Sequence, residues 1–191
     1  MARKREFDVD QAVDRAMDVF WRRGYAATSL QDLTSALGIG SGSLYAAFGS
    51  KEKLYGLALA RYTSRNAAQL VAELESAKEV RPALRAVLMA MAEADLCDPD
   101  RGCMTVNAAT ERADDPDTAA HVSATLKLVE STIAGALERA QVRGELTADK
   151  NPAELARLLT TFIQGLRVMG KARAGREFVE SAVDAAMRTL D

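Results

Sequence analysis

Residue types that stabilise small secreted or β-rich proteins are scarce in this sequence. Its 191 residues include two cysteines, four prolines, one histidine and one tryptophan, and aromatic residues make up 5%. Two cysteines cannot build a disulfide framework, so the chain must rely on an apolar core. Few prolines, with abundant alanine and leucine, favour helices over a sheet. No segment alternates apolar and polar residues with a period of two, so we assign no strands.

Long apolar runs and a large net charge are also absent. No stretch approaches the roughly 18 consecutive apolar residues that a transmembrane helix needs, and the first residues do not resemble a signal peptide. We therefore expect a cytoplasmic protein with reduced thiols and no membrane partner. The formal net charge of -2 argues against a protein that binds polyanions over its whole surface. Any interaction with nucleic acid must come from a local motif.

Capping signals and apolar stripes divide the chain into about nine helical segments. The first is expected from Asp8, whose side chain can cap a helix, to Gly24, which can adopt the left-handed stop conformation. A capping box at 28–31 opens a second, short helix, and a third runs from about 41 to 48. The remaining helices are expected at about 50–74, 82–96, 103–112, 116–143, 152–170 and 176–190.

The three N-terminal helices have the spacing of a helix-turn-helix unit. Apolar residues at helical spacing are expected to pack the second helix against the third, and glycines break the chain between them. The first turn of the third helix then faces outward, where small residues can approach base edges in a major groove. A tyrosine, a lysine and the N-terminus of the second helix are expected to reach phosphates. The predicted DNA contacts are Ser41, Gly42, Ser43, Tyr45, Lys51, Thr28 and Ser29.

A set of residues with fixed spacing covers roughly positions 8–56. It consists of Ala16, Phe20, Gly24-Tyr25, Thr28-Ser29-Leu30, Leu33, Gly38-Ile39, Gly42-Ser43-Leu44-Tyr45, Phe48 and Lys51-Glu52-Lys53-Leu54. At these positions the sequence resembles the TetR family of bacterial repressors. The resemblance implies an all-α fold, with a helix-turn-helix domain at 1–50 and a helical ligand-binding and dimerisation domain at 51–191. It also implies a dimeric repressor that binds near-palindromic, double-stranded operator DNA and is released by a small-molecule inducer.

Two positions depart from the family's pattern. Ala47 stands where the family often has a histidine that contacts the DNA backbone, and Ser41 stands where a basic residue is common. Both changes remove phosphate contacts. Operator affinity is therefore expected to be modest, or to depend on the basic residues Arg3, Lys4 and Arg5.

The resemblance places the dimer interface in the last two helices. The segments at 152–170 and 176–190 both carry more apolar residues than one covered face requires. Pairing these helices with their copies in a second chain would bury the surplus in a four-helix bundle. The alternative is that both helices pack only within their own subunit.

Polar residues on the apolar helix at 103–112 predict a ligand site. Cys103, Asn107 and Glu111 are spaced four residues apart and share one face. This stretch resembles one that borders the ligand pocket in part of the TetR family. We predict that an unidentified small molecule contacts these three residues together with Met104 and Phe162. The alternative is that Asn107 hydrogen-bonds a neighbouring helix, that Glu111 is solvated, and that the two apolar residues belong to the core.

The thiols and the single histidine offer further interpretations. Cys103 lies near a helix N-terminus, which favours its thiolate, so an alternative repressor of the same fold would sense oxidants or electrophiles, with Cys97 as the resolving thiol. The simpler interpretation is that Cys103 is a small buried apolar residue. Cys97, Cys103 and His121 lack the spacing of a metal site. We expect no metal or other cofactor.

Two other classes of protein remain as alternatives to a DNA-binding regulator. No Ser/His/Asp or Cys/His arrangement is visible in the sequence, so we expect no enzyme. The other alternative is a helical adaptor that binds only protein. Steeply salt-dependent binding to operator DNA separates a repressor from such an adaptor.

Overall fold

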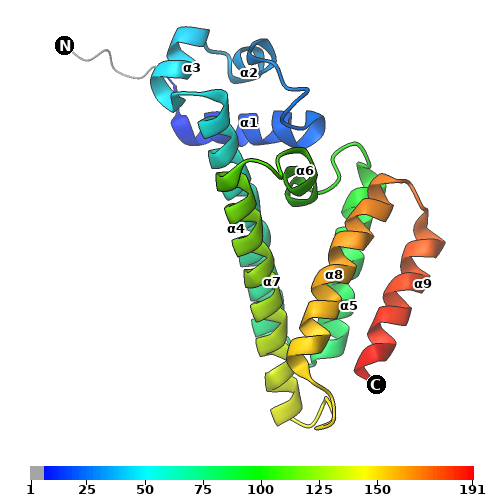
Figure 1. Ribbon diagram of the computed structural model, residues 1–191. Coiled ribbons are helices and arrows are strands. Elements are labelled where there is room, and N and C mark those ends of the chain that lie inside the picture. Colours follow the sequence, from blue (N-terminus) through cyan, green and yellow to red (C-terminus); the bar gives the residue numbers. More distant parts are fainter. Residues whose placement is uncertain (1–6) are drawn as a thin grey trace.

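The computed structural model describes residues 7–191, and these residues contain helices and no strand (Figure 1). The basic residues 3–5 lie outside this range. The all-α prediction is confirmed. The helices are α1 (Val9–Arg23), α2 (Leu30–Leu37), α3 (Ser41–Phe48), α4 (Lys51–Ser76), α5 (Val80–Cys97), α6 (Met104–Glu111), α7 (Pro116–Val142), α8 (Pro152–Lys171) and α9 (Arg176–Met187), followed by a short 3-10 helix (Arg188–Leu190).

Side-chain caps fix the starts of α1, α4, α7 and α8 where the sequence predicts them. The Asp8 carboxylate accepts hydrogen bonds from two backbone N–H groups of the first turn of α1, and Gly24 ends this helix with a φ of 78°. The predicted capping box of α2 is wrong by one residue. Ser29, not Thr28, caps the helix, and its partner is Asp32. The Asp32 carboxylate accepts the Ser29 N–H, which is the reciprocal bond expected one residue earlier, at Gln31.

Buried apolar side chains form two clusters, and α4 contributes to both. The first cluster joins α1, α2, α3, the N-terminal half of α4 as far as Tyr62, α6 and Val122 at the start of α7. The second joins the C-terminal half of α4, from Leu70, with α5, α7, α8 and α9. Because α4 runs without interruption through both clusters, it connects the helix-turn-helix unit rigidly to the rest of the chain. The predicted domain boundary at residue 50 stays a prediction. Within α4 the two clusters divide between Tyr62 and Leu70, not at residue 50.

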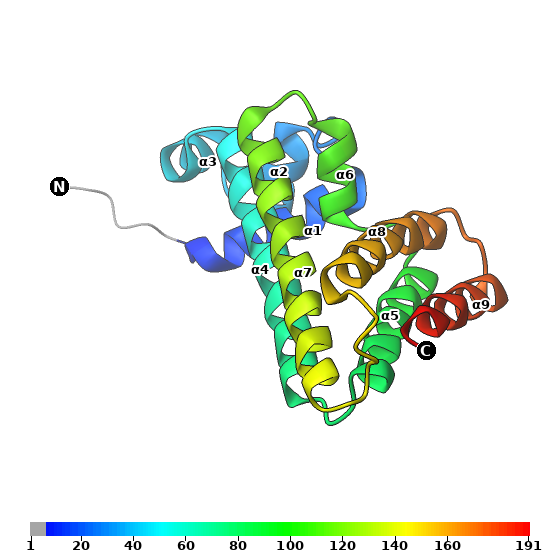
Figure 2. The ribbon, with the colours of Figure 1, turned by 60° about the horizontal axis from the view of Figure 1, so that its bottom comes forward.

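The arrangement of the long helices leaves α3 at one end of the molecule. Helices α4 and α7 lie side by side over most of their length, and α8 lies between α7 and the pair α5 and α9 (Figures 1 and 2). The short helix α6 lies beside α1, where the two clusters meet (Figure 2). None of the helices in residues 7–191 combines the length and apolar character needed to cross a membrane.

Candidate DNA-binding and ligand-binding sites

The N-terminal turn of α3 is the exposed part of the helix-turn-helix unit. Leu44 and Phe48 are buried and hold α3 against the first cluster. Ser41, Gly42 and Ser43 are all exposed. A Cβ atom added to Gly42 would meet no heavy atom within 4 Å. These three predicted contact residues therefore stand free of the protein's own body, as a helix that enters a major groove must.

The turn between α2 and α3 directs α3 outward. Gly38 has a φ of 69°, and its N–H donates to the carbonyl oxygen of Thr34 over 3.0 Å. Glycine adopts this left-handed conformation without Cβ strain, so α2 ends cleanly. Tyr45 follows on α3 with 49% of its surface exposed. Its contact with a phosphate stays a prediction, which this exposure permits.

Thr28 and Ser29 lie differently from the sequence-based expectation. Thr28 is 1% exposed, and its hydroxyl donates to the carbonyl oxygen of Gly24 over 2.6 Å. Its own N–H donates to the carbonyl oxygen of Tyr25. The Thr28 hydroxyl and N–H therefore both bond within the turn after α1, and the predicted phosphate contact at this helix N-terminus stays a prediction. Ser29 is exposed, although its N–H already donates to the carboxylate of Asp32 over 2.8 Å.

Lys51 is held inward at the start of α4. Its ammonium nitrogen lies 4.3 Å from the ring centre of Tyr25, and burial lowers the pKa of Lys51. The Tyr25 hydroxyl donates to the Glu52 carboxylate over 2.6 Å, and this hydrogen bond is the main reason that the pKa of Glu52 falls to about 2. A contact between Lys51 and a phosphate stays a prediction, and it requires the ammonium group to leave the tyrosine ring.

The C-terminal end of α6 contacts the helix-turn-helix unit. The Glu111 carboxylate accepts the backbone N–H of Tyr25 over 2.8 Å and lies against Gly24. The Arg112 guanidinium stacks on the Tyr25 ring at 3.9 Å and pairs with Asp115 at 2.8 Å. Glu111 thus joins α6 to the turn after α1, and its predicted contact with a ligand stays a prediction.

Only one of the other residues predicted to bind the ligand lies at a cavity that the structure identifies. Met104 is buried in the first cluster, and Phe162 packs against the second, so both are core residues. The side-chain amide oxygen (Oδ1) of Asn107 accepts a hydrogen bond from the Lys171 ammonium over 3.2 Å, which ties α6 to α8. These three residues do not belong to the wall of the cavity described next, and their predicted ligand role stays a prediction. Cys103 does line that cavity.

A small, mostly apolar cavity lies between α4, α6, α7 and α8. We call it the Cys103 cavity. Its volume is about 90 Å³, and among the residues described the only charged side chain in its wall belongs to Arg167. A cavity of this size holds only a few non-hydrogen atoms, since about 150 Å³ is enough for benzene. The main side chains of its wall are Tyr62, Cys103, Leu126, Val129, Ile163 and Arg167.

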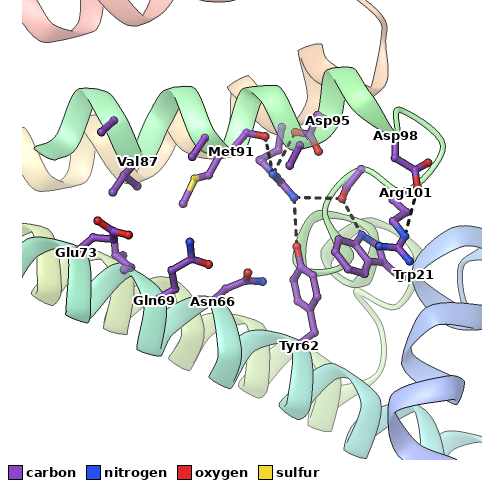
Figure 3. A pocket seen from close by; sticks show the side chains of 16 residues that line it. Trp21, Tyr62, Asn66, Gln69, Glu73, Val87, Met91, Asp95, Asp98 and Arg101 are labelled. Atoms are coloured by element: carbon purple, nitrogen blue, oxygen red, sulfur yellow. Dashed lines mark hydrogen bonds and ion pairs between the residues drawn. The ribbon is translucent and has the colours of Figure 1, made fainter. Parts of the chain in front are cut away.

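A larger and more polar cleft adjoins the Cys103 cavity on the α5 side. This α4/α5 cleft has a volume of about 400 Å³ and is open to solvent beside the exposed amides Asn66 and Gln69 (Figure 3). Its inner end is formed by Trp21 of α1. Five residues belong to the walls of both spaces, among them Tyr62 and Arg167, which lie where the two spaces meet. A ligand could therefore use both spaces together, within the range of usual ligand pockets.

Arg167 forms the polar centre of these two spaces. Its guanidinium donates to the carbonyl oxygens of Met91 (3.0 Å) and Gly102 (3.2 Å), and to the Tyr62 hydroxyl (3.4 Å), as Figure 3 shows. Arg167 is 9% exposed, and its Nη1 lies 3.3 Å from Oδ2 of Asp95, which is 2% exposed. Burial raises the pKa of Asp95, and its Oδ2 has no hydrogen-bond donor among residues 7–191.

Four residues in the wall of the α4/α5 cleft were not predicted from the sequence as site residues: Arg167, Asp95, Tyr62 and Trp21. One signal was present for the charged pair, because Arg167 directly follows Leu166 in the apolar stripe of α8, and Asp95 continues the buried stripe of α5. A charged residue on a buried helix face normally has a partner. The identity of that partner depends on how α5 and α8 pack, which helical spacing does not reveal.

The thiols and the histidine do not assemble a metal site. Cys97 is exposed at the end of α5, Cys103 is half-buried, and both are free thiols. Within residues 7–191 no group of three or more His, Cys, Asp or Glu side chains is placed to hold a metal ion. The single histidine, His121, lies 2.9 Å from the Thr63 hydroxyl instead.

Comparison with known proteins finds one family in both parts of the chain. Residues 12–57 match the family described as "Bacterial regulatory proteins, tetR family". Residues 80–186 match the family described as "Tetracyclin repressor-like, C-terminal domain". The family predicted from residues 8–56 is confirmed, and the match extends well beyond them.

Relatives match along the whole length of the chain. It is 34% identical over 195 residues to the uncharacterised HTH-type transcriptional regulator YezE of Bacillus subtilis, with 100% of both chains covered. It is 36% identical over 178 residues to the HTH-type transcriptional repressor ComR of Escherichia coli, with 92% of this chain and 85% of ComR covered. A structure of a cysteine mutant of the TetR family transcriptional regulator CifR, complexed with 26 bp double-strand operator DNA, matches with a TM-score of 0.89 at 35% identity, covering 100% of both chains.

Proposed function

Since this chain belongs to the tetR family of bacterial regulatory proteins, we propose that it represses transcription as a dimer that releases operator DNA when a small molecule binds. Membership of the family makes the chain a DNA-binding transcriptional regulator and not an enzyme. Repression, dimerisation and release by a ligand are the proposal. We place this activity in the cytoplasm, where bacterial operator DNA lies.

The exposed first turn of α3 carries the proposal for DNA binding. Ser41, Gly42 and Ser43 form a small, open helix end, to which base edges can approach closely. CifR, which is 35% identical over its whole length, is described in complex with operator DNA. A dimer of this chain would present two such helix ends to successive major grooves, roughly 34–36 Å apart.

An apolar stripe on α8 and α9 supports the proposed dimer. Leu158, Val168 and Phe178 are each about half exposed, which is unusual for large apolar side chains on two adjacent helices. The exposed residues Thr161 and Gly165 continue the stripe on α8 at helical spacing, and their small size permits close approach of a second helix. A second copy of the chain would cover this stripe in a four-helix bundle.

Replacing Leu158 by glutamate is expected to convert the dimer to a monomer. The substitution places a charge within the apolar stripe of the proposed interface. The monomer would reach only one half-site, so its affinity for an operator duplex should fall about tenfold or more. The operator would be obtained by in vitro selection from random duplexes, mass in solution measured by light scattering, and affinity by fluorescence anisotropy.

Leu57→Glu is the matched control for this experiment. Leu57 is as exposed as Leu158, but it lies on α4, away from α8 and α9. This variant should remain a dimer. The proposed interface is refuted if Leu158→Glu is also a dimer, and the proposed repressor function is refuted if selection yields no duplex that binds in a steeply salt-dependent way.

A thiol sensor is the second candidate function, and one contact of Cys103 favours it. The Tyr62 hydroxyl donates to the Cys103 sulfur over 3.6 Å, and the Arg167 guanidinium lies on the other side of that hydroxyl. A hydrogen-bond donor and a cation close to the sulfur are the surroundings in which reactive cysteines are found. The exposed Cys97 lacks this environment.

Hydrogen peroxide distinguishes the thiol sensor from a sensor that binds its ligand reversibly. If Cys103 is the sensor, peroxide should oxidise it to a sulfenic acid and lower operator affinity about tenfold or more, and a thiol reductant should restore binding. Cys103→Ser should bind the operator normally and no longer respond, whereas Cys97→Ser tests the resolving role. An equal response in Cys103→Ser would exclude this candidate.

A further inference from the structure

The backbone carbonyl of Gly102 joins the helix-turn-helix unit to the polar centre at Arg167. The indole N–H of Trp21, on α1, donates to this oxygen over 2.8 Å, and Arg167 Nη2 donates to it over 3.2 Å. The Trp21 ring also packs edge-on against the Tyr62 ring, at 4.8 Å between centres. Because Trp21 contacts both residues, a movement of Tyr62 or Gly102 would displace Trp21 and, with it, α1.

The contact between Arg167 and Tyr62 is the longest of the three hydrogen bonds that the guanidinium donates. It measures 3.4 Å, against 3.0 and 3.2 Å to the two carbonyl oxygens. Long hydrogen bonds are weak, so this is the one that another acceptor would replace at least cost. Tyr62 also lies where the Cys103 cavity meets the α4/α5 cleft. Displacing its hydroxyl would join the two spaces.

The walls of the Cys103 cavity indicate the chemistry of a ligand. Most of the surface of this wall is apolar, which favours an apolar body. The charge of Arg167 is already balanced by Asp95 at 3.3 Å, so a further anion would be repelled by the Asp95 carboxylate. An uncharged molecule with a carbonyl or similar oxygen is not repelled by the Asp95 carboxylate. Its oxygen can accept the hydrogen bond that Arg167 Nη2 now donates to the Tyr62 hydroxyl.

We propose that the Cys103 cavity binds a small, uncharged molecule bearing a hydrogen-bond acceptor. This acceptor replaces the Tyr62 hydroxyl as a partner of Arg167, and the displacement of Tyr62 weakens the contacts of Trp21 with Tyr62 and Gly102. This inference rests on the proposed function and names its ligand class and its route to the DNA-binding helices. Trp21 and Arg167 are positioning residues in this route. A ligand weakens DNA binding only if it prefers the loosened state.

Iodoacetamide provides a probe of this chemistry without knowledge of the natural ligand. In Cys97→Ser protein, Cys103 is the single remaining thiol. Its sulfur displaces iodide from the reagent, an S–C bond forms, and the thiol proton passes to the buffer. The product carries an uncharged amide oxygen into the cavity. Methyl methanethiosulfonate is the matched control, because it forms an S–S bond, expels methanesulfinate and adds only a methylthio group.

The amide adduct is expected to lower operator affinity about tenfold or more, and the methylthio adduct less than about threefold. The emission of Trp21, the single tryptophan, should shift only with the amide adduct. Trp21→Phe keeps the aromatic packing but loses the indole N–H, so the unmodified variant should already bind the operator more weakly than the Cys97→Ser parent, and the amide adduct should lower its affinity by less than about threefold further. Tyr62→Phe, which has no hydroxyl to displace, should also show a reduced response.

Three results would overturn the inference. They are equal losses of affinity with both adducts, an undiminished response in both Trp21→Phe and Tyr62→Phe, and a Cys103 thiol that neither reagent modifies. Mass spectrometry verifies each adduct, and thermal unfolding verifies that each variant is folded. Failure of the unmodified protein to bind any selected duplex would instead refute the proposed function, so the two failures are distinguishable.

Discussion

Replacing Arg167 by methionine is expected to lower the free energy of unfolding by about 3–5 kcal/mol. The substitution leaves the Asp95 carboxylate buried without its counter-charge and removes the donors to the carbonyl oxygens of Met91 and Gly102. Urea unfolding, followed by circular dichroism at a fixed concentration of protein, measures the loss. Arg157→Met is the control, because Arg157 lies on the same helix and pairs with Glu130 at the surface, where an ion pair contributes about 1 kcal/mol or less.

The pH dependence of this variant identifies the cause of the loss. Burial raises the pKa of Asp95 in the folded state, and removing Arg167 should raise it further. A folded state that binds more protons than the unfolded state gains stability as the pH falls. Arg167→Met should therefore recover part of its stability between neutral pH and the ordinary pKa of aspartate. Asp95→Asn in the same variant should recover stability at neutral pH, and a loss independent of both pH and Asp95 would contradict this account.

Replacing Ser43 by glutamate is expected to lower operator affinity about 100-fold without loss of stability. A carboxylate at this exposed position would face DNA phosphates, and like charges brought together in an interface are costly. Two copies of α3 in the proposed dimer would each bear the charge, so a tenfold effect at each, or about 1.4 kcal/mol, is sufficient. Ser43 is the third residue of α3, where a negative charge favours the helix. Fluorescence anisotropy with the selected duplex measures the affinity.

Ser64→Glu is the control for the Ser43 variant. It adds the same charge at an exposed position on α4, away from the first turn of α3, and should bind the operator within about threefold of the wild-type affinity. Thermal unfolding of both variants verifies that they are folded. If Ser43→Glu binds the operator as tightly as Ser64→Glu does, α3 does not enter the groove, and the proposed mode of DNA binding is wrong.

Helix positions could be predicted closely because their signals are local. Four helices begin at a residue whose side-chain oxygen accepts a backbone N–H of the first turn, a bond that spans only two or three residues. These caps are Asp8, Ser50, Asp115 and Asn151. The error at α2 has the same origin. Thr28 and Ser29 are adjacent, and the side chain of either residue can cap a helix. Ser29 caps α2 because Thr28 is buried and its hydroxyl donates to the carbonyl oxygen of Gly24.

Most residues of the predicted ligand site lie outside the wall of the Cys103 cavity, because helical spacing indicates which residues share a face but not what that face contacts. Cys103, Asn107 and Glu111 do share a face of α6 or its cap. Along the length of α6 that face passes from the Cys103 cavity to α8 and then to the turn after α1. Three neighbouring positions therefore have three different partners.

The sequence by itself determined the helices, the family and the outward placement of the first turn of α3, since caps, glycines and apolar spacing act over a few residues. Only the tertiary structure decided that Arg167, Asp95, Tyr62 and Trp21 meet, because they come from four different helices. A buried charge must find its partner wherever packing places one. That partner is separated from it by many residues of chain, and no local pattern records the contact.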